Sequence, residues 1–145
     1  MQSVGASRRS ETVVMVDDDE DVRLILHDVL DEAGFDVIEC EDLATAFALL
    51  VGVVPDIVLL DGDLPDGCGL EVARWMRCRR AYDGVRILGL SGRSSPSDVE
   101  AAFAAGCDAV VAKPCTAEML LDEIHAVSDG ALLSAEPSSR RGGRR

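Results

Sequence analysis

The chain has 145 residues, a hydrophobic fraction of 48% and a formal net charge of −13 at pH 7. This length predicts one domain, and the apolar fraction is enough for a hydrophobic core, which excludes a chain that is disordered throughout. The acidic balance excludes a general nucleic-acid surface, because phosphate backbones bind clustered Lys and Arg. We find no hydrophobic signal segment and no apolar run of membrane-spanning length, so we expect a cytoplasmic protein without a membrane partner.

The two ends of the chain differ in charge from its centre. The basic residues at these ends are Arg8, Arg9, Arg140, Arg141, Arg144 and Arg145. We expect a flexible N-terminal tail over residues 1–10, a folded domain over residues 11–128 and a disordered, Arg-rich C-terminal tail over residues 129–145. The last segment is too short and too polar to hold a core, so we expect no output domain in it.

The first half of the chain alternates between strand and helix patterns. Residues 12–17 form an apolar run that ends in acids, which predicts a buried parallel strand with carboxylates at its C-terminal edge. Apolar side chains share one helical face over residues 22–33, and Gly34 ends this helix. Residues 35–40 predict a second strand, and residues 43–50 predict a second helix.

The middle of the chain continues this alternation. Residues 57–61 predict a strand that again ends in an acid. A loop rich in Pro and Gly follows at residues 64–69, and a third helix extends from it to about residue 80. The fourth strand is predicted at residues 85–91 and the fourth helix at residues 95–106.

The last strand and helix complete the pattern. Residues 108–112 predict the fifth strand, which Lys113 and Pro114 interrupt, and residues 116–127 predict the fifth helix. Five strand–helix units with connections this short require a parallel sheet that is covered by helices on both faces.

Two further groups of side chains have simple interpretations. Four arginines near the end of the third helix predict a solvated basic patch that the helix dipole favours; they are Arg74, Arg77, Arg79 and Arg80. The five cysteines form no CxxC pair and no zinc-like spacing, so we expect them to be small buried side chains.

Polar side chains stand at the ends of four predicted strands. Three aspartates follow the first strand at residues 17–19, Asp61 ends the third, Ser91 ends the fourth and Lys113 follows the fifth. Crowded carboxylates raise each other's pKa unless a cation lies among them, and oxygen ligands of this kind suit Mg²⁺. A lysine and a hydroxyl opposite the metal could bind a phosphoryl group. The set therefore predicts a site where a carboxylate attacks phosphorus.

Four motifs in this order resemble one protein family. The runs VVMVDDDEDVR, VLLDGDLPDGCGLE, LGLSG and VVAKP resemble the receiver domain of bacterial two-component response regulators, over about residues 12–128. The resemblance implies an α/β fold: a flavodoxin-like, doubly wound, five-stranded parallel sheet of order 2-1-3-4-5 with five helices. Among receivers, the chain resembles the single-domain type of the chemotaxis regulators.

The resemblance also implies a role for each strand-end residue. Asp61 is the expected phosphoacceptor. Asp17, Asp18 and Asp61 are the expected side-chain ligands of Mg²⁺, and the backbone carbonyl of Asp63 is expected to complete the protein's share of the metal shell.

Further roles follow for the residues around the expected phosphoryl group. Ser91 would bond a phosphoryl oxygen, Gly92 would leave space for it and Lys113 would pair with it. Pro114 is expected to follow a cis peptide bond.

The sequence departs from the family's pattern at the expected switch. The family usually has an aromatic residue three positions before the lysine, where this chain has Val110, so the output switch is expected to be smaller or built differently. Cys115 follows the Lys-Pro pair where the family often has Phe. In the family, the positions of Arg93 and Asp63 flank the phosphoryl group and modulate how water reaches it, so the resemblance implies that the two could form a pair that gates hydrolysis.

The resemblance implies a single-domain response regulator. A sensor histidine kinase or histidine phosphotransfer protein would donate the phosphoryl group to Asp61, and the output would be contact with a downstream protein. The domain would catalyse only its own phosphotransfer and dephosphorylation, so we do not expect an enzyme. The alternative is a phosphate shuttle or sink without conformational output, which Val110 slightly favours. A remote alternative is a phosphatase of the haloacid-dehalogenase type, because Asp61 and Asp63 match its DxD motif.

Overall fold

The computed structural model describes residues 10–92 and 95–129. Five parallel strands form one sheet in the order β2-β1-β3-β6-β7, which confirms the predicted order 2-1-3-4-5. The strands are β1 (Thr12–Val16), β2 (Asp36–Cys40), β3 (Ile57–Asp61), β6 (Arg86–Ser91) and β7 (Ala109–Ala112). The predicted tails, residues 1–10 and 129–145, lie outside the described residues except for Ser10 and Asp129.

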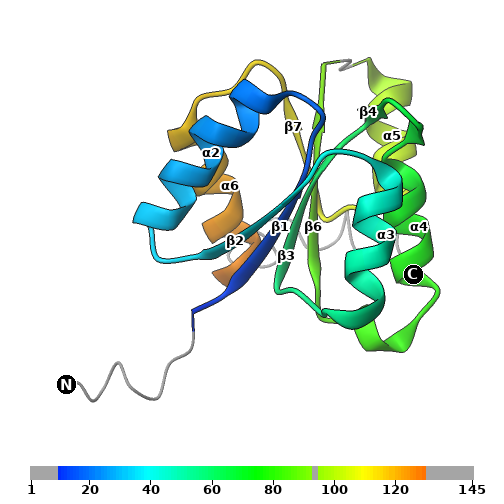
Figure 1. The fold of residues 1–145 in the computed structure, drawn as a ribbon. Helices are drawn as coiled ribbons and strands as arrows, with labels where there is room; N and C mark the ends of the chain where they lie inside the picture. The colour runs from blue at the N-terminus through cyan, green and yellow to red at the C-terminus, as the bar shows by residue number, and fades with distance from the viewer. Residues whose placement is uncertain (1–9, 93–94, 130–145) are drawn as a thin grey trace.

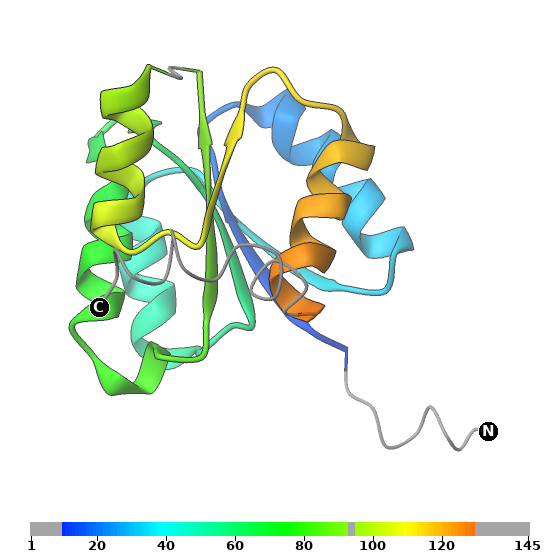
Figure 2. The same ribbon diagram turned by 180° about the vertical axis from the view of Figure 1, so that it is seen from behind.

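Five helices cover the two faces of this sheet. They are α2 (Glu20–Glu32), α3 (Leu43–Gly52), α4 (Leu70–Arg77), α5 (Pro96–Ala105) and α6 (Ala117–Asp129). Helices α2 and α6 lie on one face, and α3, α4 and α5 lie on the other, as the two opposite views show (Figures 1 and 2). None of the helices in the described part of the chain is long and apolar enough to cross a membrane.

The strands divide their side chains between two hydrophobic cores. Successive residues of a strand point to opposite faces of the sheet. In β1, Val13 and Met15 therefore pack under α2 and α6, while Val14 and Val16 pack under α3, α4 and α5. All four are fully buried. This explains why the central strands are continuous apolar runs rather than alternating ones.

The ends of the helices are set by local side chains. Asp19 begins α2 by accepting hydrogen bonds from the amides of Asp21 and Val22. This cap begins the helix at Glu20, two residues before the first apolar residue on which the prediction rested. Ser95 begins α5, and Gly106 ends it with a φ of 112°, a conformation that favours glycine.

Three predictions need correction. The loop predicted at residues 64–69 contains a short hairpin of β4 (Asp63–Leu64) and β5 (Gly67–Cys68). The third helix, α4, ends at Arg77, and a 3-10 turn, η1 (Arg80–Tyr82), follows it. The cysteines are free thiols, but Cys68 and Cys78 are exposed, so the expectation that all five are buried is wrong.

Candidate functional site

The carboxyl ends of the parallel strands bring the predicted residues to one edge of the sheet. Asp17 follows β1, Asp61 ends β3, Ser91 ends β6 and Lys113 follows β7. Backbone hydrogen bonds join neighbouring segments there: the amide of Lys113 donates to the carbonyl of Ser91 over 2.8 Å, and the amide of Gly62 donates to a carbonyl of β6. The edge is therefore a rigid frame for these side chains.

Three carboxylates meet in this frame. Asp17, Asp18 and Asp61 each offer an oxygen atom, and these atoms lie within 4.8 Å of one another. Asp17 is fully buried, the exposed fraction of Asp61 is 5%, and Asp18 is exposed. Two of the carboxylates are thus buried and the third is open to solvent, so a cation can reach the cluster from the side of Asp18.

The environment of Asp61 disfavours its negative charge. Burial is the largest cause that raises the pKa of Asp61, and the charges of Asp17 and Asp18 raise it further. A hydrogen bond from the amide of Asp63 and the charge of Lys113 lower this pKa, but the net direction is upward. A bound cation would remove that penalty.

Lys113 is the positive group of the pocket. Its Nζ lies 3.0 Å from Oδ2 of Asp17 and 3.5 Å from Oδ2 of Asp61. Burial alone lowers the pKa of Lys113, but the hydrogen bonds and charges of the two carboxylates outweigh burial and raise it. Lys113 contacts two of the three carboxylates, Asp17 and Asp61, and balances only part of the cluster's charge. The oxygen ligands therefore fit a hard divalent cation such as Mg²⁺.

A second layer of residues that the sequence analysis missed holds Asp17 in place. Arg23 donates from Nη1 to the backbone carbonyl of Asp17 over 2.7 Å, and its Nε lies 3.0 Å from Oε1 of Glu39 on β2. Oδ1 of Asp17 also accepts a hydrogen bond from the amide of Asp19. The motif places Arg23 one helical turn after the acids, but only the sheet order shows that Glu39 is its partner.

The segment after Asp61 folds back on the phosphoacceptor candidate. The amide of Asp63 donates to Oδ1 of Asp61 over 3.2 Å, and the amide of Gly69 donates to the carbonyl of Gly62 over 3.0 Å. A Cβ atom at Gly69 would collide with the carbonyl oxygen of Asp61. Glycine at position 69 therefore lets the loop close against the end of β3.

The remaining predicted residues lie around this pocket. Ser91 is partly exposed at the end of β6, and open space surrounds the position that a Cβ of Gly92 would take. The Lys113–Pro114 peptide bond is cis, as the resemblance implies. Arg93 lies outside the described residues, so its predicted pairing with Asp63 stays a prediction.

Val110 borders a cavity behind the pocket. The cavity has a volume of about 100 Å³, and Val110 lines it together with Ser91 and small residues such as Gly89 and Ala102. Val110 is partly buried and packs against the core under α3, α4 and α5. The small side chain leaves space where an aromatic one would extend.

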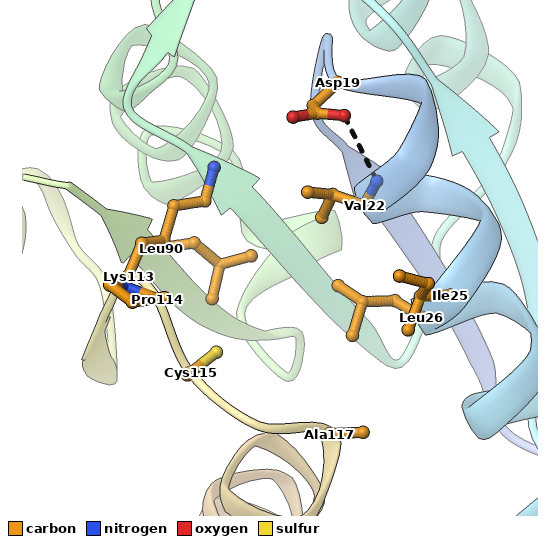
Figure 3. Close-up of a pocket in the computed structure, with 9 residues that line it drawn as sticks. All are labelled: Asp19, Val22, Ile25, Leu26, Leu90, Lys113, Pro114, Cys115 and Ala117. Carbon is orange, nitrogen blue, oxygen red and sulfur yellow. Dashed lines mark hydrogen bonds between the residues drawn. The ribbon is translucent and has the colours of Figure 1, made fainter.

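An apolar groove adjoins the acidic pocket on the side of α2 and α6. It has a volume of about 440 Å³, and Figure 3 shows Lys113 and Asp19 at its polar end and Ile25 and Leu26 along α2. Cys115 lies on the opposite wall, in the segment that joins β7 to α6. Ile25 is 60% exposed and borders the groove on the side of α2.

Comparisons with known proteins identify the family. The model of the response regulator receiver domain matches residues 13–125. KdpE, the KDP operon transcriptional regulatory protein of Escherichia coli, is 36% identical over 102 residues, which are 70% of this chain and 44% of KdpE. DivK, a polar-differentiation response regulator of Brucella ovis, is 24% identical over 115 residues, which are 79% of this chain and 94% of DivK.

The solved structures agree with the sequence comparisons. The chemotaxis response regulator CheY4 of Vibrio cholerae has a TM-score of 0.77 at 27% identity, and the match covers 81% of this chain and 98% of that one. The chain spans about half or less of the length of the first curated relatives it matches.

The matched residues include the whole carboxyl edge of the sheet. Asp61 therefore ends the third strand of a receiver fold and Asp63 begins the hairpin that follows it, so the pair is not the DxD motif of a haloacid-dehalogenase phosphatase. With its parallel sheet and its pocket of Asp17, Asp18, Asp61 and Lys113, the chain belongs to the response regulator receiver domain family.

Proposed function

We propose that this receiver domain accepts a phosphoryl group on the carboxylate of Asp61. The observation that carries the proposal is the crowding of three carboxylates within 4.8 Å around a pocket that Lys113 closes. Asp17, Asp18, Asp61 and the backbone carbonyl of Asp63 would hold Mg²⁺. The metal, when bound, would neutralise charge on the carboxylates and on the incoming phosphoryl oxygens.

The side chains have distinct tasks in this transfer. A carboxylate oxygen of Asp61 attacks phosphorus, a bond to phosphorus forms, and the bond from phosphorus to the donor's histidine nitrogen breaks. That nitrogen leaves with the bonding electron pair, so the histidine returns to its unmodified form. Lys113 pairs with a phosphoryl oxygen, and the Ser91 hydroxyl donates a hydrogen bond to another.

The donor would be a sensor histidine kinase or a histidine phosphotransfer protein. Members of the family take phosphoryl groups from histidine kinases, and the donor must bring its histidine to Asp61. The apolar groove along α2 adjoins the pocket and presents Ile25 to solvent, so we place part of the donor's docking surface there. Replacing Ile25 by Lys should slow transfer from a protein donor and leave labelling by a small phosphodonor unchanged. Equal slowing of both reactions would remove the groove from the docking surface.

The output of phosphorylation would be a changed contact with a downstream protein. The second candidate is a shuttle or sink that passes the group on without a conformational change. Val110 slightly favours this second candidate, because a valine cannot make the large inward movement of an aromatic ring. Amide exchange with and without a phosphodonor would separate the two: protection changes around Val110 and α6 indicate a switch, and unchanged protection indicates a shuttle.

The central claim is tested by intact mass. The protein is incubated with Mg²⁺ and a small phosphodonor, such as phosphoramidate, and compared with Asp61→Ala. We expect one added phosphoryl group in the unmodified sequence and none in the variant. Equal labelling of the two proteins, or no labelling of either, would overturn the proposal.

A further inference from the structure

One carboxylate connects the loop after β3 to a helix that is distant in the sequence. Asp66 lies at the turn between β4 and β5. Its Oδ1 accepts a hydrogen bond from the amide of Leu43 over 2.9 Å, and its Oδ2 accepts one from the amide of Ala44 over 3.1 Å. These amides begin α3, where backbone N–H groups have no partner within the helix and the helix dipole favours a negative charge.

Helix α3 also has a local cap. Asp42, the residue just before the helix, accepts a hydrogen bond from the amide of Thr45 over 2.8 Å. A local Asp at this position is the usual way to begin a helix. The bonds of Asp66 therefore add something that the local cap does not: they join α3 to a segment more than twenty residues further along the chain.

The hairpin packs against the same helix end. A Cβ atom at Gly67, whose φ is +149°, would lie only 2.7 Å from Cδ1 of Leu43. Leu64, on the other strand of the hairpin, is buried in the core that also contains Leu43. The hydrogen bonds of Asp66 and the close packing of Gly67 against Leu43 hold the tip of the loop at the beginning of α3.

The same loop carries the groups that meet Asp61. Its base is closed by the hydrogen bond from the amide of Gly69 to the carbonyl of Gly62. Between base and tip lies Asp63, whose amide donates to Oδ1 of Asp61. A loop that is fixed at both points leaves the backbone of Asp63 little freedom to move.

We propose that Asp66 is a positioning residue for the phosphoacceptor site. By holding the hairpin on α3, it fixes the backbone of Asp63, and thereby both the amide that orients Asp61 and the carbonyl that would face the metal. Groups that orient metal ligands from outside the first coordination shell typically change metal affinity tenfold or more when they are removed. The inference rests on the proposed function of Asp61, but the clamp itself is a property of the fold.

The two caps of α3 give a matched pair of variants. Asp66→Ala and Asp42→Ala each remove a carboxylate from the same helix end, and each should lower the melting temperature. Affinity for Mg²⁺ is measured by calorimetric titration, and labelling by phosphoramidate is measured by intact mass. We expect Asp66→Ala to weaken Mg²⁺ binding about tenfold and to slow labelling, while Asp42→Ala keeps both within about twofold.

A conservative variant separates position from charge. Asp66→Asn keeps a carbonyl oxygen that can accept one of the two hydrogen bonds, so it should recover part of the affinity that Asp66→Ala loses. Equal losses in Asp66→Ala and Asp42→Ala would show that Asp66 is only a helix cap. No loss in Asp66→Ala would overturn the proposal directly.

A separate measurement keeps this proposal distinct from the proposed function. If the unmodified protein takes up neither Mg²⁺ nor a phosphoryl group, the proposed function fails, and amide exchange still tests the clamp. Exchange at residues 62–69 should be faster in Asp66→Ala than in Asp42→Ala. Equal exchange in the two variants would overturn the clamp whatever the state of Asp61.

Discussion

The two ends of the central sheet differ in how their charges are balanced. At the carboxyl ends of the strands, Asp17, Asp18 and Asp61 meet within 4.8 Å, and Lys113 balances only part of their charge. At the amino ends, Arg77 and Asp108 form an ion pair of 2.9 Å. At the amino ends the opposite charge comes from the chain itself, whereas at the carboxyl ends a cation from solution could relieve the remaining negative charge.

Arg77, at the amino ends of the strands, makes several hydrogen bonds besides its ion pair with Asp108. Its guanidinium donates to the backbone carbonyls of Gly106, Tyr82 and Val85. A Cβ atom at Gly106 would collide with the side chain of Arg77, so the arginine lies directly against that glycine. One side chain thus joins the end of α4 to the segments that lead into β6 and β7.

The largest effect that we expect comes from removing this arginine. Arg77→Ala would remove one hydrogen-bond donor from each of three carbonyls and would break the ion pair with Asp108, which is partly buried. Breaking a fully buried pair from one side costs about 3 kcal/mol or more, and this partly buried pair together with the three lost carbonyl bonds should cost about 3 kcal/mol. Urea unfolding, with the slope unchanged, measures this loss in the free energy of unfolding.

Arg77→Lys provides the control for that variant. A lysine keeps the charge but cannot reach three carbonyls and a carboxylate at once, so its loss should lie between zero and that of Arg77→Ala. A loss below about 1 kcal/mol for Arg77→Ala would place Arg77 among ordinary surface residues and remove the contrast between the two ends of the sheet.

The sequence could predict one end of the sheet much better than the other. Asp17, Asp61 and Lys113 stand at strand ends in recognisable motifs, so the apolar pattern and the parallel order were enough to bring them together. Arg77 stands in a run of arginines and was interpreted as part of a solvated patch, which is wrong. Its partners are mostly backbone carbonyls, and because every residue has a carbonyl, the sequence does not indicate which ones accept a hydrogen bond from Arg77.

The second expected effect concerns the carboxyl end, where a cation from outside should stabilise the chain. Mg²⁺ at ten times its dissociation constant should add about 1.4 kcal/mol to the free energy of unfolding, because it binds the folded pocket and not the unfolded chain. Asp18→Asn should lose most of this gain, since it removes the solvent-exposed one of the three proposed carboxylate ligands. Thermal melts with and without Mg²⁺ measure it, and an equal gain in Asp18→Asn would place the metal elsewhere.

The third effect is smaller and has the opposite sign from the first. Without divalent metal, Asp61→Asn should stabilise the protein at neutral pH by less than Mg²⁺ stabilises the unmodified protein, because it removes a buried charge beside Asp17 and Asp18. Lys113 keeps its hydrogen bond to Asp17 in this variant. Urea unfolding in a chelator measures the change. A loss of stability would show that Asp61 is well solvated or well paired. The charges at both ends of the sheet would then be balanced without a cation from solution.

The smallest effect is the pH dependence of that gain, and its sign follows from the raised pKa of Asp61. The folded state holds the proton of Asp61 more tightly than the unfolded chain, in which the ordinary value of 3.8 applies. Well below that value both states are protonated, and Asp61 contributes nothing to the pH dependence.

As the pH rises above the ordinary value, the unfolded chain releases the proton first, and the stability of the unmodified protein falls until the folded pKa is passed. The difference in unfolding free energy between Asp61→Asn and the unmodified protein should therefore grow as the pH rises above the ordinary value of 3.8 and remain constant once the folded pKa is passed. The other carboxylates titrate in both proteins, so this difference reports on Asp61 and its neighbours alone. A difference that shrinks as the pH rises would mean that the folded pocket lowers the pKa of Asp61, and that the carboxyl end is balanced without a cation.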